Sequence, residues 1–384
     1  MQYLDLYHTR YKKVQKALKE RNIAACLLTD PIQIRYATGT CMMPLWTAFN
    51  YCRYVLVAAD SEPTIWEYPE GVFTAKKIWN DVRPCEYWQY RFSGKDANSQ
   101  AKIWSEHIYE VLKEKGINNE KIGIDSLDFY GHQALTNLGI NLCDADEVLQ
   151  AARKVKTAEE ITIMQDTVNI TQTALKKFEE KITPGVSEHE LLATFWESLL
   201  AQGGEWCYTR LIASGERVNP WFQEASSRKV QPGDLVAIDT DVIGLEGYAC
   251  DISRTFVCGD KFNDEQADLY RYAKEYLTHI QEVMKPGMGH ADMMNNLPKV
   301  KDSLLAQRYP IFAHGIGMDD EPPFYPFADQ KTSAVNADVL EPGMVICIEF
   351  YAGQKGGKYG VKLEDQLLIT ENGSELMNDY PYLI

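Results

Sequence analysis

Acidic residues gather in one short segment of the sequence. Residues 234–256 read DLVAIDTDVIGLEGYACDISRTF and place Asp239, Asp241 and Asp251 among strand-forming residues. Side chains two apart on a strand share a face, so Asp239 and Asp241 are expected to point the same way. The glycine-rich residues 244–247 predict a hairpin turn that returns Asp251 beside Asp241. Like charges that close destabilise a sheet, which predicts a cation between them.

A second pair of acids follows about a hundred residues later, in matching motifs. QPGDLVAID and EPGMVICIE each place an acid seven residues after a proline, at Asp239 and Glu349. GYACD and GVKLE each end on an acid four residues after a glycine, at Asp251 and Glu364. ITPGVSEHEL and MKPGMGHADM also correspond, and each predicts the end of one helix and the start of another. The sequence therefore predicts an internal repeat whose halves each offer two carboxylates.

These acids predict a metal centre. Five converging carboxylates carry more charge than one lysine or arginine neutralises, whereas two divalent ions bridged by carboxylates would do so. His314, in FAHGIG, is the histidine whose glycine-rich setting suggests a further ligand. A single histidine is more often structural than metal-binding. The alternative remains that the acids are solvated charges at strand edges and that the repeat is accidental.

Composition restricts the class of protein. The chain has 384 residues with 39 basic and 55 acidic ones, and a net charge of −16 disfavours binding to nucleic acid or to an anionic membrane surface. Its nine cysteines are odd in number and never spaced as CxxC, which favours a reducing cytoplasm. The start of the chain predicts a charged amphipathic helix, and no apolar run is long enough for a membrane span. A soluble cytoplasmic protein is expected.

The length predicts two domains. From residue 23 to about 150, short apolar strands alternate with helical segments, and this alternation is typical of an α/β domain. A long Lys- and Glu-rich helical stretch then begins near Arg153. We expect one domain over residues 1–152 and a second, which contains the repeat, over residues 153–384.

A family resemblance covers the whole chain. Together, PGDLVAID, GYACDISRTF, FAHGIG, PGMVICIE and VKLEDQLLIT resemble the pita-bread superfamily of prolidase, aminopeptidase P, methionine aminopeptidase and creatinase. The resemblance implies an N-terminal creatinase-like α/β domain, a C-terminal pita-bread domain with a pseudo-twofold repeat, and a homodimer. It also implies a dinuclear site for divalent ions (Fe, Mn, Co or Zn), with these ligands: Asp239 or Asp241 or both, Asp251, His314, Glu349 and Glu364.

The sequence departs from the peptidases of this superfamily at three points. Asp241 stands where they have a glycine, and the loop that contains Asn219 and Trp221 lacks their histidine. A second histidine, which they carry shortly after HGIG, is also missing. Without these proton donors, peptide hydrolysis is expected to be poor. The complete set of metal carboxylates argues against a metal-free hydrolase and against a non-catalytic scaffold.

At these same points the chain is similar to the metal-dependent dimethylsulfoniopropionate lyases. The similarity rests on Asp-x-Asp, on NPWFQE, on Tyr309 five residues before His314 and on Asp320 six residues after it. It implies that Tyr309 lies by the substrate and that Asp320 is the general base. A carboxylate of ordinary pKa is a weak base, so we expect a dry, acid-lined setting that raises the pKa of Asp320. The implied reaction is a β-elimination from a small onium carboxylate that yields dimethyl sulfide and acrylate. An Xaa-Pro dipeptidase, or another metallohydrolase of a small amide, is the alternative.

Aromatic faces would bind a sulfonium cation well. We expect Tyr309, Trp221 and Trp46 to contribute, and the resemblance to the superfamily implies that Trp46 reaches the pocket of a partner subunit. Each aromatic residue taken alone is more often part of a core. Further candidates are Phe49, Tyr51, Phe222, Phe324 and Tyr325.

Overall fold

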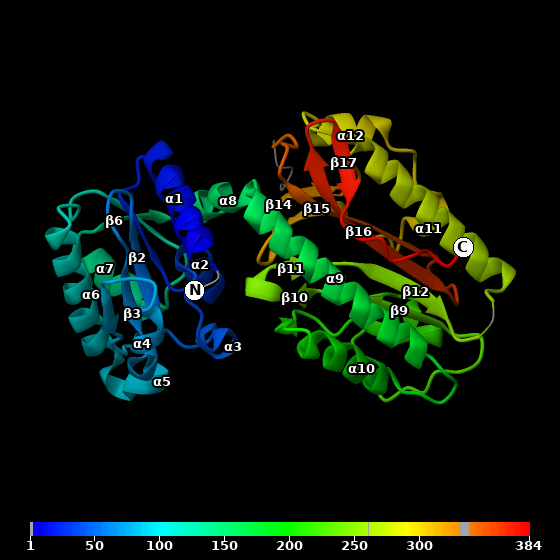
Figure 1. Cartoon of the computed structure of the whole chain (residues 1–384), viewed down its shortest axis with the longest axis horizontal. Helices are drawn as coiled ribbons and strands as arrows, with labels where there is room; N and C mark the ends of the chain where they lie inside the picture. The colour runs from blue at the N-terminus through cyan, green and yellow to red at the C-terminus, as the bar shows by residue number, and fades with distance from the viewer. Residues whose placement is uncertain (1–2, 260, 331–337) are drawn as a thin grey trace. The chain divides into compact units, whose positions relative to one another are not determined.

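The computed structural model describes residues 3–259, 261–330 and 338–384. The chain divides into two compact units, Met1–Arg153 and Lys154–Ile384, which are coloured blue to green and green to red in Figure 1. Among the described residues, no helix combines the length and the apolar content that crossing a bilayer requires.

The first unit is built on a mixed sheet of six strands, in the order β4-β3-β2-β1-β5-β6, within its described residues. β1 pairs antiparallel with β2 and parallel with β5. The strands are β1 (Ala25–Leu28), β2 (Tyr54–Ala58), β3 (Thr64–Glu67), β4 (Val82–Pro84), β5 (Lys121–Ile124) and β6 (Asn141–Asp144). The helices are α1 (Leu4–Glu20), α2 (Pro31–Thr38), α3 (Pro44–Thr47), α4 (Val72–Ala75), α5 (Tyr90–Ser93), α6 (Ala97–Glu114), α7 (Phe129–Asn137) and α8 (Asp146–Lys154), with 3₁₀ turns η1 (Pro69–Gly71) and η2 (Gly94–Asp96).

Helices of the second unit begin at the side-chain caps that the sequence provides. Ser187 and Glu190 form the predicted capping box at the start of α10, and Thr157 and Glu160 form another at the start of α9. Such caps satisfy backbone N–H groups that have no partner within the helix. The helices are α9 (Ala158–Lys181), α10 (Glu188–Ala201), α11 (Asp264–Val283) and α12 (His290–Asn296), with 3₁₀ turns η3 (Gly215–Val218), η4 (Leu245–Gly247) and η5 (Asp302–Leu304).

Three sheets form the strand layers of the second unit, within the part of it that the structure describes. Their orders are β12-β9-β8, β11-β10-β7 and β14-β13-β15-β16-β17. The strands are β7 (Trp206–Cys207), β8 (Ile212–Ser214), β9 (Leu235–Asp239), β10 (Val242–Ile243), β11 (Ala249–Cys250), β12 (Ser253–Val257), β13 (Ile311–Ile316), β14 (Asp320–Pro326), β15 (Val345–Gly353), β16 (Gly360–Thr370) and β17 (Gly373–Leu376).

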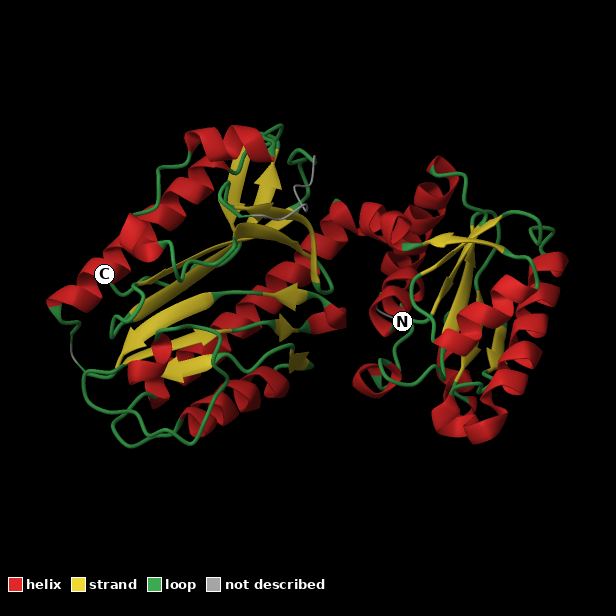
Figure 2. Cartoon of the chain, turned by 180° about the vertical axis from the view of Figure 1, so that it is seen from behind, coloured by secondary structure: helices red, strands yellow, loops and turns green. Residues whose placement is uncertain are grey.

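The internal repeat is visible in this unit. β9 pairs antiparallel with β12 after α9 and α10, and β15 pairs antiparallel with β16 after α11 and α12. Helices cover the outer faces of the strands in Figures 1 and 2; on one side Tyr276 of α11 stacks on Phe350 of β15, with ring centroids 4.3 Å apart. The two strand pairs meet where the hydroxyl of Thr255 donates to the carbonyl of Lys362. The predicted mixed α/β architecture with a repeated second unit is confirmed.

Candidate active site and metal centre

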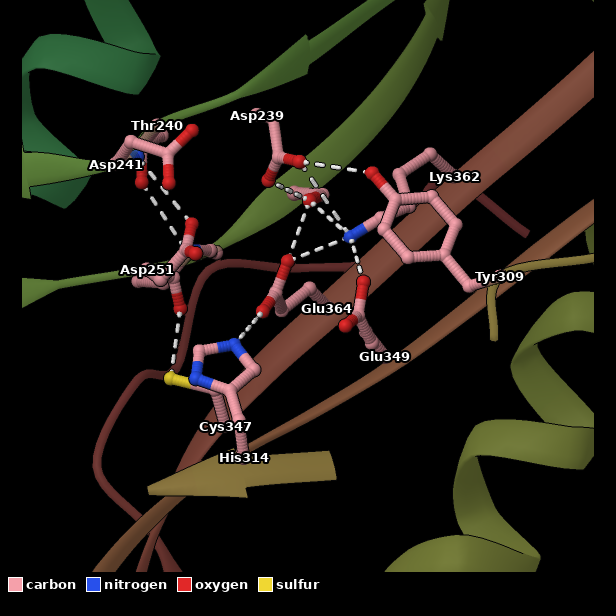
Figure 3. A network of polar contacts seen from close by, with 12 residues as sticks. Asp239, Thr240, Asp241, Asp251, Tyr309, His314, Cys347, Glu349, Lys362 and Glu364 are labelled. Carbon is pink, nitrogen blue, oxygen red and sulfur yellow. Dashed lines mark hydrogen bonds and ion pairs between the residues drawn. The ribbon is translucent and has the colours of Figure 1, made fainter. Parts of the chain in front are cut away.

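The two strand pairs bring the predicted ligands to one place. Asp239 ends β9, and Asp251 lies between β11 and β12. Glu349 of β15 stands opposite Glu364 of β16 in the sheet register, and His314 lies on the neighbouring β13. All five side chains are buried, and Figure 3 shows them pointing toward one another. The repeat therefore delivers two acids from each half to a common centre.

Asp241 belongs to this cluster, but its backbone conformation differs from the one expected. β9 ends at Asp239 and β10 begins at Val242, and Asp241 between them has a φ of 40°. The expectation that Asp239 and Asp241 share the face of one continuous strand was wrong, because the backbone turns there. The predicted hairpin does form: Val242 pairs with Cys250, and the N–H of Asp241 donates to Asp251 Oδ1 at 3.2 Å. The hydroxyl of Thr209 donates to the Asp241 carboxylate.

Lys362 lies beside three of the acids, a contact that the sequence argument overlooked. Its ammonium is fully buried and lies 2.6 Å from Glu364 Oε2, 2.8 Å from Glu349 Oε2 and 3.5 Å from Asp239 Oδ2. Lys362 precedes Glu364 by two residues on β16, so both side chains share a face of the sheet. That spacing was readable in GVKLE and would have located the lysine.

The charge of the cluster exceeds what Lys362 compensates. The cluster contains six carboxylates, those of Asp239, Asp241, Asp251, Asp320, Glu349 and Glu364. The ammonium of Lys362 balances one of them, so the formal charge is −5 when the imidazole of His314 is neutral. Burial raises the pKa of Asp239 to about 6 and that of Glu349 to about 7, and burial together with the neighbouring Asp239 charge raises the pKa of Asp241 to about 8. Without further cations, several of these groups would hold protons near neutral pH.

His314 connects the buried acids to Asp320. Its Nε2 lies 3.4 Å from Glu364 Oε1, and its Nδ1 lies 3.6 Å from Asp320 Oδ1. Burial alone would lower the pKa of His314, but the charges of Asp320 and Glu364 override it and raise the pKa to about 10. Without metal, a cluster of such negative charge holds the imidazole as a cation, whereas binding a metal ion would require it to be neutral.

The donor atoms fit divalent metal ions. One oxygen or nitrogen atom from each of Asp251, His314 and Asp320 lies within 4.8 Å of the other two, and so does one oxygen from each of Asp239, Asp251 and Glu364. Asp251 belongs to both groups. Glu364 Oε1 is buried, and its partner among the described residues is the His314 imidazole at 3.4 Å, an ion pair without hydrogen-bond geometry. A His314 that binds a metal as a neutral ligand leaves this oxygen in need of another cation. Oxygen donors with one imidazole suit Mn, Fe, Co or Zn.

Asp320 is the least buried member of the cluster. It opens β14, directly after the turn that follows β13, and its side chain is 47% exposed. We expected a dry setting with a raised pKa. The direction of the pKa is confirmed, because burial and the charge of Glu364 raise it despite the opposing charge of His314. In the single chain the setting is not dry, since Asp320 reaches solvent at the end of a hairpin.

Tyr309 is held beside the cluster by Trp221. The indole Nε1 of Trp221 donates to the Tyr309 hydroxyl at 2.7 Å, and this hydroxyl lies 3.5 Å from Asp239 Oδ2. The Tyr309 ring faces the ammonium of Lys362, 4.6 Å from the ring centroid. The Phe222 ring packs against Tyr309 at an interplanar angle of 30°, with centroids 4.7 Å apart, and Phe222 is 64% exposed. Trp46 belongs to the first unit, so its part in the site stays a prediction.

A buried acid anchors the loop that carries Trp221 and Phe222. The carboxylate of Glu188 accepts hydrogen bonds from the backbone and hydroxyl groups of Ser214 and Ser226, and it pairs with Arg217. It thus ties together the two ends of residues 214–226. The start of α10 at Ser187 was visible in the sequence, but the bonds of the next residue, Glu188, to serines 26 and 38 residues later depend on the tertiary fold.

The fold and this cluster define a class of protein. Residues 162–371 match the metallopeptidase family M24, and residues 10–155 match the creatinase/prolidase N-terminal domain. The chain belongs to the M24 family, and its predicted resemblance to the pita-bread superfamily is confirmed. Enzymes of this family use divalent metal ions.

Among individual relatives, the chain is 33% identical to the dimethylsulfoniopropionate lyase DddP of Roseovarius nubinhibens, over 97% of this chain and 85% of the relative. It is 29% identical to the Xaa-Pro dipeptidase of Pyrococcus furiosus, over 95% of this chain and 96% of the relative. The crystal structure of the prolidase from Pyrococcus horikoshii superimposes with a TM-score of 0.76 at 25% identity, covering 97% and 99% of the two chains.

Proposed function

We propose that the chain is a dinuclear-metal carbon–sulfur lyase that cleaves dimethylsulfoniopropionate to dimethyl sulfide and acrylate. The observation that supports this most strongly is the position of Asp320. Its carboxylate reaches solvent while standing next to Asp251 and His314. A base in that position can meet a small substrate at the mouth of the cluster. The full-length similarity to dimethylsulfoniopropionate lyase DddP supports the same reaction.

The metal ligands in this proposal are the buried acids and the histidine: Asp239, Asp241, Asp251, His314, Glu349 and Glu364. When bound, two divalent ions supply positive charge that stabilises the negative charge developing on the substrate carboxylate. Lys362 neutralises part of the acid charge from the side of the sheet, where its ammonium contacts Glu349 and Glu364. Thr209 orients the carboxylate of Asp241.

Asp320 acts as the general base of a β-elimination. Its carboxylate takes the proton from the carbon next to the substrate carboxylate, the electron pair forms the carbon–carbon double bond, and the carbon–sulfur bond breaks. Dimethyl sulfide leaves as a neutral molecule, so its departure requires no proton donor. This agrees with a site that lacks the two histidines expected of the peptidases. In the metal-free cluster, burial and the charge of Glu364 raise the pKa of Asp320, and a raised pKa makes a carboxylate a better proton acceptor.

Tyr309 and the loop that carries Trp221 bind the substrate. Trp221 orients the Tyr309 hydroxyl, and Phe222 offers an exposed ring against Tyr309. Aromatic faces beside a negatively charged cluster attract a sulfonium cation. Trp46 of a partner subunit completes the pocket in a cytoplasmic homodimer.

An Xaa-Pro dipeptidase is the second candidate, favoured by the similarity to the Pyrococcus furiosus enzyme over nearly the whole of both chains. Both reactions require the same metal ligands, so metal content does not separate them. The test supplies metal-replete protein with dimethylsulfoniopropionate and, separately, with an Xaa-Pro dipeptide, and measures dimethyl sulfide in the headspace and free proline. Dimethyl sulfide without proline supports the lyase. Proline release without dimethyl sulfide overturns it.

A further inference from the structure

A short segment beside the cluster contacts one acid, Asp241, and the turn that precedes another, Asp320. In residues 206–210, Trp206 and Cys207 form β7, which pairs with β10, Cys207 opposite Val242. The N–H of Tyr208 donates to the carbonyl of Asp241 at 2.8 Å, and the hydroxyl of the next residue, Thr209, donates to the Asp241 carboxylate. Both ends of Asp241, its backbone and its side chain, are therefore fixed by this segment.

The side chain of Tyr208 extends to the turn that precedes Asp320. Its hydroxyl donates to the carbonyl of Met318 at 2.7 Å. Met318 lies between β13 and β14, two residues before Asp320. The same turn is closed by a bond from the N–H of Gly317 to the carbonyl of Asp319 at 3.0 Å, and its first carbonyl accepts from the N–H of Ala249 at 2.7 Å. Tyr208 adds a side-chain bond to this turn.

A buried ion pair fixes the turn from the protein interior. Glu321 follows Asp320, is fully buried and pairs with Lys156, whose side chain is 2% exposed. The Glu321 carboxylate lies so close under Gly317 that a Cβ there would stand 2.5 Å from its oxygen. The turn therefore rests on Glu321 on one side and is bonded to Tyr208 at Met318.

We propose that Tyr208 is a positioning residue for Asp320. Its backbone holds Asp241 in the cluster while its hydroxyl holds the turn that presents Asp320, so one residue sets the spacing between the base and a metal ligand. The inference rests on the proposed function of Asp320. It adds a residue that touches neither substrate nor metal but determines where the base stands.

The test is the Tyr208→Phe variant, which removes the hydroxyl and keeps the ring. Misplacing a reacting group by about 1 Å costs as much as about 10²-fold in rate, and the loss of one of the turn's bonds is expected to lower kcat about tenfold, with KM within about twofold. With substrate deuterated next to the carboxylate, the isotope effect on kcat should rise, because proton transfer to a misplaced Asp320 becomes slower relative to the other steps. Bound metal should stay unchanged.

The matched control is Tyr276→Phe. The Tyr276 hydroxyl also donates to a backbone carbonyl, that of Pro298, at 2.8 Å, but it lies on α11 away from the cluster. This variant should keep the native kcat and isotope effect. Equal kcat and equal isotope effects in Tyr208→Phe and native protein overturn the inference, as does a loss of activity that merely follows loss of metal.

Hydrogen exchange separates this inference from the proposed function. Amides of residues 315–321 should exchange faster in Tyr208→Phe than in native protein or in Tyr276→Phe, whatever the reaction is. If native protein releases no dimethyl sulfide but these amides exchange faster in Tyr208→Phe than in native protein, the lyase assignment fails. The inference that Tyr208 stabilises the turn is then still supported. If exchange in this turn is unchanged, Tyr208 does not hold it and the inference fails by itself.

Discussion

Replacing Lys362 by methionine tests the electrostatics of the cluster most sharply. The substitution keeps the length of the side chain and removes a fully buried ammonium from contact with Glu364, Glu349 and Asp239. Removing one partner of a buried ion pair costs about 3–5 kcal/mol, because the remaining charge is left uncompensated. We expect a loss of this size in the free energy of unfolding of the metal-free protein at pH 8.

The loss in the free energy of unfolding caused by Lys362→Met should depend on pH and on bound metal. As the pH falls from 8 to 6, protons reach Glu349, whose pKa is raised to about 7, and an uncharged carboxyl needs no ammonium beside it. The penalty is therefore expected to be smaller at pH 6 than at pH 8. Divalent ions compensate the same carboxylates, so saturating Mn²⁺ should also reduce the penalty.

The assay is urea unfolding followed by circular dichroism, with and without Mn²⁺. Lys154→Met is the control, because its ammonium contacts Glu341 at 2.8 Å near the surface, where an ion pair contributes about 1 kcal/mol or less. The view that this cluster lacks positive charge would be refuted by either of two results. One is that Lys362→Met lowers the free energy of unfolding by no more than Lys154→Met does, and the other is that Mn²⁺ leaves the loss unchanged.

Three further predictions concern the base, the aromatic contact and pH. Asp320→Asn should abolish dimethyl sulfide release and leave the metal content, measured by elemental analysis, unchanged; activity at the native rate would contradict its role. Trp221→Phe removes the bond to the Tyr309 hydroxyl, worth about 1 kcal/mol, and should raise KM about fivefold in the same assay. Because burial raises the pKa of Asp239 to about 6 and that of Glu349 to about 7, the folded metal-free protein binds more protons than the unfolded chain in this range. Its Tm should therefore rise from pH 8 to pH 6, and a fall would contradict these shifts.

Most of the ligand cluster could be predicted from sequence because its spacing is encoded locally. The repeated motifs carry Asp239 and Glu349 at the same distance from a proline, and the strand pairs then bring both halves together. The turn at residues 244–247 was likewise readable from its glycines. Local spacing is enough where a hairpin sets the geometry.

Contacts that depend on the packing of distant segments could not be predicted. Asp241 lies at a break between two strands, so strand periodicity gave the wrong reason for its direction. Glu188 ties a loop by bonds to Ser214 and Ser226, and Tyr208 bonds a turn more than a hundred residues away. None of these partners is marked by a motif, because polar contacts of this kind follow from the tertiary fold.

The number of divalent ions bound per chain tests the central electrostatic claim most directly. Elemental analysis of protein loaded with Mn²⁺ and freed of excess ion should find two ions per native chain. In the isosteric Glu364→Gln variant, the charge of a carboxylate that contacts both Lys362 and His314 through different oxygens is removed, so this variant should retain fewer. A folded native protein that binds no Mn²⁺, or a Glu364→Gln variant that still binds two, would contradict the account.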